Sequence, residues 1–269
     1  MLYEALGSEP PKFAHLPVIN GTDGKKLSKR TGDTNALDYR DKGYLPNALL
    51  NFLALLGWND GTEQEIFSTQ ELADKFSLER INKSPAVFDQ KRLDWLSGHY
   101  IRQMDINELY KHVKGEGSRE QEAGGFWPEE AKKASEDYKK QVLALVQERL
   151  KYFAEIPELT RFFFTDLPIN PALISEHKQL KKCERTKLSQ WLEMAKKSLE
   201  ESDFSEEDLQ NRLNDLMEQT GQKPAVLFSL IRIATTQAPA SPGLAGTLAV
   251  LGKKTSINRI DKTAKTLGA

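Results

Sequence analysis

The sequence is short of cysteine, of net charge and of long apolar runs. A single cysteine among 269 residues excludes an internal disulfide and a thiolate zinc cluster. The longest apolar stretch, Ala48 to Leu56, is interrupted by Asn51, whereas a bilayer-spanning helix needs about 20 apolar residues. The N-terminus has neither a basic segment followed by an apolar one nor an Arg- and Ser-rich presequence. We therefore expect a soluble, cytoplasmic protein that makes no membrane contact.

Composition and length indicate an ordinary globular chain of two or three domains. Hydrophobic residues make up 39% and charged residues 29%, and domains usually contain roughly 100–200 residues. The net charge is −1, but residues 222–269 hold seven cations and one carboxylate. Such a basic end is typical of a local contact surface for an anionic partner. A solvated helical tail would have the same composition.

Most of the chain has apolar residues at helical spacing, which predicts a mainly α-helical fold with a small mixed part at the N-terminus. The stretch Leu45–Leu56 is apolar on nearly every side and predicts a buried helix. Ser68 and Glu71 have the spacing of a helix capping box. Residues 114–138 combine four glycines with many charges, a composition that predicts a loop insertion.

The densest positive charge follows a β-prone segment and a turn. Four cations lie within six residues of a glycine-flanked loop: Lys25, Lys26, Lys29 and Arg30. A lysine ammonium is a compact charge suited to phosphate oxygens, and such a cluster could stabilise the charge of a departing pyrophosphate. By spacing alone the loop is more often solvated surface, and the Walker-type phosphate pattern is absent.

Lys26-Leu27-Ser28-Lys29-Arg30 resembles the K-M-S-K-S signature of class I aminoacyl-tRNA synthetases. The surrounding sequence is similar to one branch, the bacterial-type glutamyl-tRNA synthetases. Four ordered blocks carry this resemblance: residues 10–34, 37–58, 81–102 and 230–260. The resemblance covers nearly the whole chain and weakens around residues 114–138 and 165–220.

In that family the signature loop closes over ATP during amino-acid activation. The resemblance implies that Lys26 and Lys29 are catalytic contacts to the ATP phosphates. It also implies that Ser28 supports the loop geometry and that Arg30 lies in the same phosphate site, in place of a final serine. Mg²⁺ would accompany ATP in the complete enzyme, and no resident metal is implied.

The family's catalytic domain also carries an H-I-G-H-type motif, and none of the four histidines lies in such a context. The chain therefore resembles the C-terminal half of the enzyme. Residues 1–105 would end the catalytic fold and form the stem-contact region, and 106–175 and 176–269 would form two helical anticodon-binding subdomains. We expect no activity from this chain alone.

The resemblance also identifies residues that would contact RNA. Arg232, between aliphatic residues on a predicted helix, and Arg149 are expected at anticodon bases. Leu244 should begin a helix, where its side chain could pack on a base. The alternatives are a surface ion pair for Arg232 and core packing for Leu244. Lys253, Lys254, Arg259 and Lys262 are expected to bind phosphates, contacts that position the RNA but carry no sequence information.

The resemblance thus predicts the C-terminal portion of a glutamate–tRNA ligase. It would be a monomer that binds tRNA(Glu) and, in the complete enzyme, glutamate and ATP. The alternative is a stand-alone helical RNA-binding or adaptor protein that retains the lysine loop but has no aminoacylation activity.

Overall fold

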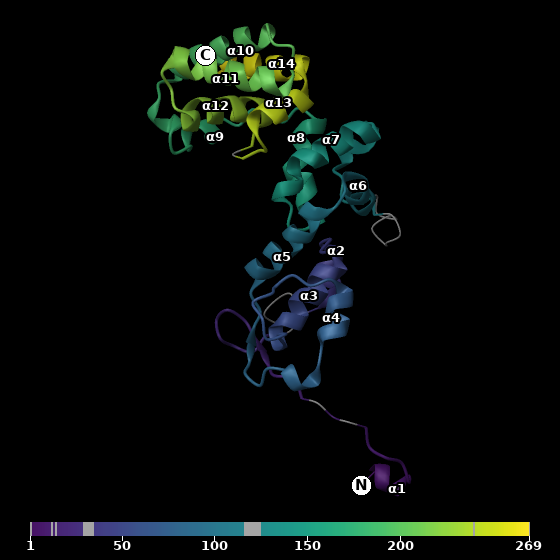
Figure 1. Ribbon diagram of the computed structural model, residues 1–269. Coiled ribbons are helices and arrows are strands. Elements are labelled where there is room, and N and C mark those ends of the chain that lie inside the picture. The colour runs from purple at the N-terminus through teal and green to yellow at the C-terminus, as the bar shows by residue number, and fades with distance from the viewer. Residues whose placement is uncertain are drawn as a thin grey trace. The chain divides into compact units, whose positions relative to one another are not determined.

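The structure is a computed structural model that describes residues 2–11, 13, 15–28, 35–115, 125–238 and 240–268. The predicted mainly helical fold is confirmed, and in the described ranges the strands form one two-stranded parallel sheet (Figure 1). The same ranges contain no helix that is long and apolar enough to cross a bilayer. The chain divides into two compact units, residues 1–103 with 151–153, and residues 104–150 with 154–269.

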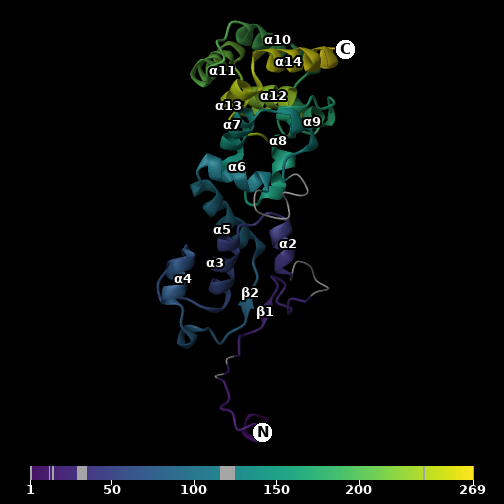
Figure 2. The same ribbon diagram turned by 90° about the vertical axis from the view of Figure 1, so that its right-hand side faces the viewer.

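The first unit contains the sheet, whose strands β1 (Ile19–Asn20) and β2 (Ala86–Val87) pair with Ile19 opposite Ala86 (Figure 2). Its helical elements are α1 (Leu2–Ala5), α2 (Ala36–Asp41), α3 (Pro46–Gly57), α4 (Thr69–Lys75), the short 3-10 helix η1 (Leu78–Arg80) and α5 (Gln90–Gln103). The core of this unit gathers Tyr39, Tyr44, Phe52, Leu93 and Leu96.

The α4 helix starts as its sequence predicts. The Ser68 hydroxyl accepts a hydrogen bond from the Glu71 backbone N–H at 3.1 Å, and the Glu71 carboxylate accepts one from the Ser68 N–H at 2.7 Å. This reciprocal pair is a capping box, which satisfies two backbone donors that the first helical turn leaves unpaired.

The α3 helix differs from its prediction as a fully buried helix. Leu50 and Leu53 are each 44% exposed, whereas Phe52 on the opposite side is buried. The reason lies in what packs against the helix: α4, α5 and β2 contact it, and the side that carries Leu50 and Leu53 stays open to solvent. The first unit therefore presents an apolar helix face.

The second unit consists of helices in the described ranges. In chain order they are α6 (Ile106–Lys114), η3 (Glu129–Lys133), α7 (Glu136–Val146), η4 (Gln147–Arg149), η5 (Phe153–Glu155, which begins in the first unit), α8 (Ile156–Phe164), α9 (Ala172–Ser175), η6 (Leu180–Lys182), α10 (Arg185–Glu200), α11 (Glu206–Thr220), α12 (Pro224–Thr236), α13 (Leu244–Leu251) and α14 (Lys253–Gly268).

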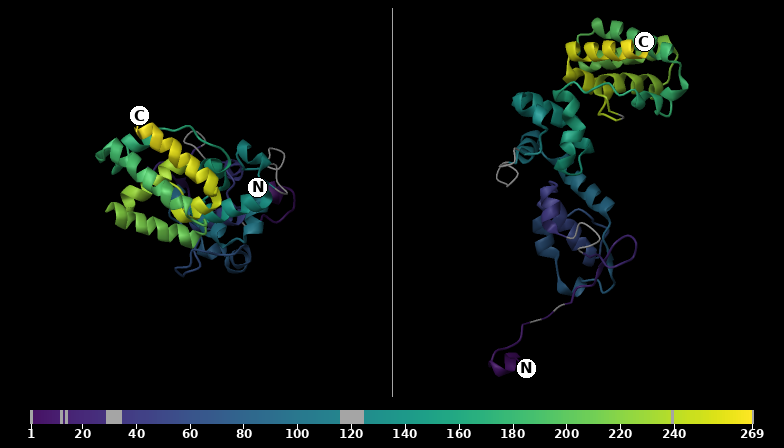
Figure 3. Two further views of the ribbon diagram at one scale, coloured as in Figure 1. Left: turned by 90° about the horizontal axis from the view of Figure 1, so that it is seen from above. Right: turned by 180° about the vertical axis from the view of Figure 1, so that it is seen from behind.

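The C-terminal helices share one apolar core, to which α10 to α14 each contribute buried aliphatic side chains. The α14 helix lies alongside α10 over much of its length, and it also contacts α12 and α13 (Figures 1 and 3). A separate cluster joins α7 and α8 to the end of α13 through Val142, Phe162, Phe163 and Leu251. The second unit is thus held together on two sides of α13.

The predicted loop insertion at residues 114–138 needs correction. Residues 116–124 lie outside the described ranges, but those after them are structured: Glu129–Lys133 form η3, and Glu136 begins α7. Ala131 is fully buried, and the Trp127 ring lies 5.6 Å from that of Phe164, edge to face. The charged residues of this segment therefore lie on the surface of packed helices. Composition alone does not distinguish such a surface from a loop.

Candidate nucleic-acid interface

Arg149 is the last residue of η4, the short turn that extends α7. The Gln147 side chain of this turn donates a hydrogen bond to the Met104 carbonyl at 2.9 Å, and Leu150 directly after it is fully buried. The Arg149 side chain is exposed. The turn is therefore anchored on both sides of an arginine that faces solvent.

Arg232 lies in the middle of α12 between buried neighbours, Ile231 and Ile233. Its own side chain is half-buried, and its Nε donates a hydrogen bond to the Ser241 hydroxyl at 2.9 Å. Ser241 is 2% exposed, and its hydroxyl in turn donates to the Pro242 carbonyl at 3.2 Å. Since only Nε is used by this contact, the guanidinium retains its other donors.

The charge of Arg149 acts on the Arg232 guanidinium. Burial lowers the pKa of the Arg232 guanidinium, and the nearby charge of Arg149 lowers it further. In the described ranges neither arginine forms an ion pair with a carboxylate. Two like charges that converge without a neutralising acid are unfavourable by themselves. Such a pair favours an electron-rich ligand that accepts hydrogen bonds from both.

Leu244 begins α13, as predicted, but its side chain does not reach solvent. It is 5% exposed and belongs to the core shared by α10 to α14. The expectation that it packs on an RNA base is therefore replaced by its alternative, core packing. Gly243 occupies the N-cap position without a side-chain capping hydrogen bond, and the residues of the first turn, Leu244 to Thr247, are all buried.

The predicted phosphate contacts on α14 differ in exposure and in whether they already have a partner within the protein. Lys254 is exposed and free of ion pairs in the described part of the chain, whereas the Lys253 ammonium donates to the Ser202 carbonyl at 2.9 Å. Lys262 is paired with Asp166 at 3.1 Å. Arg259 is 9% exposed and fully engaged with protein acceptors. Its expected role as a phosphate contact is wrong, because its guanidinium faces the protein interior.

The lysine-rich segment lies in the first unit, directly after β1. A tight turn is closed by hydrogen bonds from the Gly21 N–H to the Lys25 carbonyl, at 2.8 Å, and from the Leu27 N–H to the Ile19 carbonyl, at 2.9 Å. Lys26 therefore follows the turn on a hydrogen-bonded backbone, and its side chain is exposed. Ser28 is exposed as well, whereas the predicted contacts Lys29 and Arg30 lie outside the described residues.

Two partners of the candidate arginines were not predicted from the sequence. Ser241 holds Arg232, and Asp166 accepts from Arg259 at 2.8 Å. Ser241 occupies a Ser-Pro-Gly turn, which suggests a bend but no partner. Asp166 lies two residues after Phe164, where α8 ends. Neither local pattern predicts which distant arginine the side chain contacts, so these two contacts are visible only in the folded structure.

Comparison with known proteins agrees with this division. Residues 1–95 match the family model of the catalytic domain of class I tRNA synthetases of the E and Q type. Residues 108–264 match the model of an anticodon binding domain. The first unit and the second unit thus correspond to two parts of a class I aminoacyl-tRNA synthetase.

Individual proteins similar to this chain identify the branch of the family more specifically than the two family models do. A glutamate–tRNA ligase of Prosthecochloris aestuarii is 37% identical over 264 residues, 97% of this chain and 52% of that protein. The crystal structure of a glutamate–tRNA ligase from Elizabethkingia meningosepticum, in complex with its amino acid, has a TM-score of 0.72 at 26% identity and is matched over 99% of this chain and 54% of its own. For the glutamate–tRNA synthetase of Elizabethkingia anophelis the TM-score is 0.70 at 25% identity, over 98% and 53%.

The chain belongs to the glutamyl-tRNA synthetase family, in which it corresponds to the end of the catalytic domain and the anticodon-binding domain. The resemblance read from its sequence is confirmed. The chain spans about half the length of the relatives that it matches.

Proposed function

We propose that this chain binds the anticodon of tRNA(Glu) through its second unit, as part of a glutamate–tRNA ligase. This proposal is carried by two arginines in the region that matches an anticodon binding domain: Arg149, exposed on an anchored turn, and Arg232, held by the Ser241 hydroxyl. Neither is paired with a carboxylate in the described residues.

The chemistry of an unpaired anticodon fits this pair. Sequence-specific RNA recognition uses splayed bases, whose edges accept hydrogen bonds and whose faces stack on guanidinium planes. Arg232 is held by Ser241 through Nε, so its remaining donors keep a fixed direction. Arg149 is exposed beside it, and we assign it to the last base of the anticodon. Lys254, exposed on α14, would hold a phosphate and position the RNA without reading it.

The lysine-rich segment of the first unit, which contains Lys25 and Lys26, is suited to bind the phosphates of ATP. Lys25 and Lys26 project into solvent from a backbone that cross-turn hydrogen bonds hold, and ammonium groups at this site would stabilise the charge of leaving pyrophosphate. In the complete enzyme, the glutamate carboxylate would attack the α-phosphate of ATP, forming glutamyl-adenylate and releasing pyrophosphate. A hydroxyl at the tRNA end would then attack the glutamyl carbonyl and release AMP. Mg²⁺ would enter with ATP.

A titration of this chain with labelled tRNA(Glu), which measures binding affinity, tests the proposal. The titration compares this tRNA with a transcript that differs only in the anticodon, at several salt concentrations, because phosphate contacts depend strongly on salt. We expect a preference for the cognate anticodon that Arg232→Ala reduces by ~1–3 kcal/mol. Lys254→Ala, the control, should weaken binding of both transcripts alike.

Binding that ignores the anticodon at every salt concentration would instead support the stand-alone RNA-binding or adaptor protein. Catalysis needs a separate test, because we expect no glutamate-dependent ATP–pyrophosphate exchange from this chain alone. In a chimera, the chain would replace the matching half of a complete relative. Exchange by this chimera should fall about 10²-fold with Lys26→Ala, as for the loss of one group that stabilises transition-state charge. An unchanged rate would remove Lys26 from the phosphate site.

A further inference from the structure

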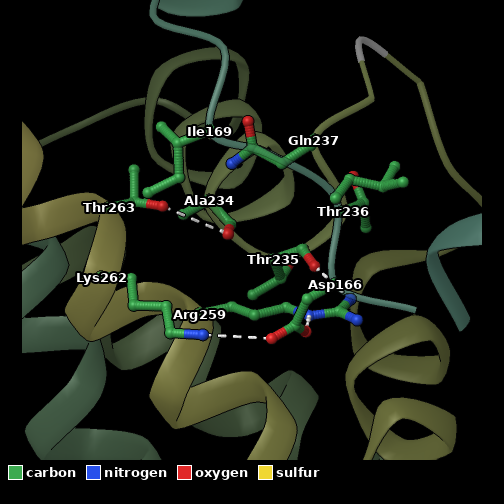
Figure 4. Close-up of a pocket in the computed structure, with 10 residues that line it drawn as sticks. Asp166, Ile169, Ala234, Thr235, Thr236, Gln237, Arg259, Lys262 and Thr263 are labelled. Carbon is green, nitrogen blue, oxygen red and sulfur yellow. Dashed lines mark hydrogen bonds and ion pairs between the residues drawn. The ribbon is translucent and has the colours of Figure 1, made fainter.

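Arg259 uses its guanidinium to join three helices of the second unit. From α14, its Nε donates to the Asp166 carboxylate at 2.8 Å, and Nη2 donates to the Thr165 carbonyl at 2.8 Å. Nη1 donates to two carbonyls, those of Phe162 and Thr235, each at 2.8 Å. Figure 4 shows the Arg259 side chain between Asp166 and Thr235, with Lys262 reaching the same carboxylate.

The four acceptors belong to two different parts of the unit. Phe162, Thr165 and Asp166 form the end of α8 and the residues after it, and Thr235 lies in the last turn of α12. The last carbonyls of a helix have no partner within the helix, so one buried cation satisfies acceptors at both helix ends. The Arg259 guanidinium, with Lys262, also holds the pKa of the Asp166 carboxyl below its usual value.

The two helix ends lead to the two arginines of the proposed anticodon site. Thr235 follows Arg232 by nearly one helical turn, and the hydroxyl of the next residue, Thr236, donates to the Arg232 carbonyl at 2.8 Å. On the other side, α8 packs against α7, and the Tyr138 hydroxyl of α7 donates to the Phe163 carbonyl at 3.0 Å. The α7 helix continues into η4 and ends at Arg149.

We propose that Arg259 is a positioning residue that sets the spacing between Arg149 and Arg232, and thereby the discrimination between anticodons. This inference rests on the proposed function. A planar guanidinium is required because it offers five donors in a fixed fork, whereas a lysine has three rotating donors on one nitrogen. Arg259→Lys would keep the charge beside Asp166 but could not span the carbonyls of both α8 and α12.

The test compares Arg259→Lys with Asp261→Asn, a control on the same helix. Asp261 accepts from Lys196 of α10, so its loss loosens α14 within the C-terminal bundle and leaves the α8 contacts in place. Affinities for tRNA(Glu) and for the anticodon-substituted transcript are measured at a temperature at which both variants are folded. We expect Arg259→Lys to reduce the affinity ratio by about tenfold, within the range of one mispositioned base contact, and Asp261→Asn to leave it unchanged.

A double-mutant cycle separates positioning from general loosening. If Arg259 acts through Arg232, adding Arg259→Lys to Arg232→Ala should cause a smaller loss of discrimination than Arg259→Lys causes alone, because substitutions within one hydrogen-bonded network are not additive. An unchanged affinity ratio in folded Arg259→Lys, equal losses for both transcripts, or full additivity would overturn the inference. If Arg259→Lys does not fold, Asp166→Asn removes the carboxylate charge that faces Arg259 and keeps the three carbonyl acceptors, and it should lower the ratio by a smaller factor.

The two proposals fail in different ways. If Arg232→Ala itself leaves discrimination intact, the proposed anticodon site is wrong. If Arg232→Ala abolishes discrimination and both Arg259→Lys and Asp166→Asn preserve it, only the positioning role of Arg259 is wrong.

Discussion

Gly246 of α13 lies so close to Leu145 of α7 that an added Cβ would come within 2.9 Å of the Leu145 Cδ2 atom and 3.2 Å of a Glu206 carboxylate oxygen. The first distance is shorter than real Cβ contacts. Both neighbouring atoms are the far ends of side chains, however, so they can move. This close approach packs α13 against α7 within the second unit.

Substitution at Gly246 should therefore depend on size. Alanine gains about 1 kcal/mol of helix propensity over glycine, which should offset the displacement of Leu145, so Gly246→Ala should be nearly neutral. Gly246→Val adds branched bulk against the same atoms and should lower the free energy of unfolding by about 1–3 kcal/mol. Chemical denaturation measures both. A valine variant as stable as the alanine variant would show that α7 and α13 are not tightly packed.

Ser241→Ala should weaken anticodon discrimination and leave general RNA affinity unchanged. The buried Ser241 hydroxyl is the acceptor for Arg232 Nε, and without it the guanidinium loses its fixed direction. We expect a loss no larger than that for Arg232→Ala, since a hydrogen bond to a charged group contributes about 1.5–3 kcal/mol. The measurement is the affinity ratio of cognate to anticodon-substituted tRNA. If that ratio is unchanged, Ser241 does not orient Arg232.

Ser256→Ala should stabilise the protein. Ser256 lies in α14 with no exposed surface, and in the described ranges its hydroxyl oxygen has no hydrogen-bond partner. A buried unsatisfied hydroxyl costs about 1–3 kcal/mol, so its removal should raise the free energy of unfolding measured in urea. Ser189→Ala is the matched control: the Ser189 hydroxyl donates to the Ala264 carbonyl at 2.9 Å, and its loss should be destabilising. Equal effects of the two variants would contradict this distinction.

Acid should loosen the contacts around Arg259. Hydrogen bonds from Arg259 and then from Lys262 lower the pKa of Asp166 from its ordinary 3.8. A carboxyl with a lowered pKa stabilises the fold above the pKa of the unfolded chain, and this stabilisation is lost as the pH falls through the lower folded-state value. Stability measured from pH 6 to about pH 2 should therefore fall less steeply in Asp166→Asn than in the unaltered protein. An identical slope would mean that Asp166 titrates normally.

The local elements of this fold are readable from sequence, because their causes are local. The Ser68 and Glu71 capping box needs only two side chains three residues apart, and both of its hydrogen bonds form. The family resemblance is similarly a property of the order of residues along the chain, and the comparisons confirm it.

The candidate site was only partly predictable, because exposure depends on tertiary packing. Lys254 and Arg259 look alike in a basic C-terminal segment, yet one is exposed and the other buried. A signal for Arg259 did exist: it shares a helical face with Ser256, Ile260 and Thr263, all buried. For Leu50 and Leu53 of α3 no such signal exists, since a helix that is apolar all round gives no indication of which side its neighbours cover.

The connection between α13 and α14 consists of a single residue, Gly252, whose φ of 79° is a backbone conformation that favours glycine. One residue inserted there would turn α14 by about 100° around its axis, since a helix has 3.6 residues per turn. Arg259 would then swing away from its acceptors and Ile260 toward water. Changes in chain length should therefore destabilise the fold more at this connection than in surface loops. A deletion or insertion at position 252 should lower stability more than most single substitutions nearby.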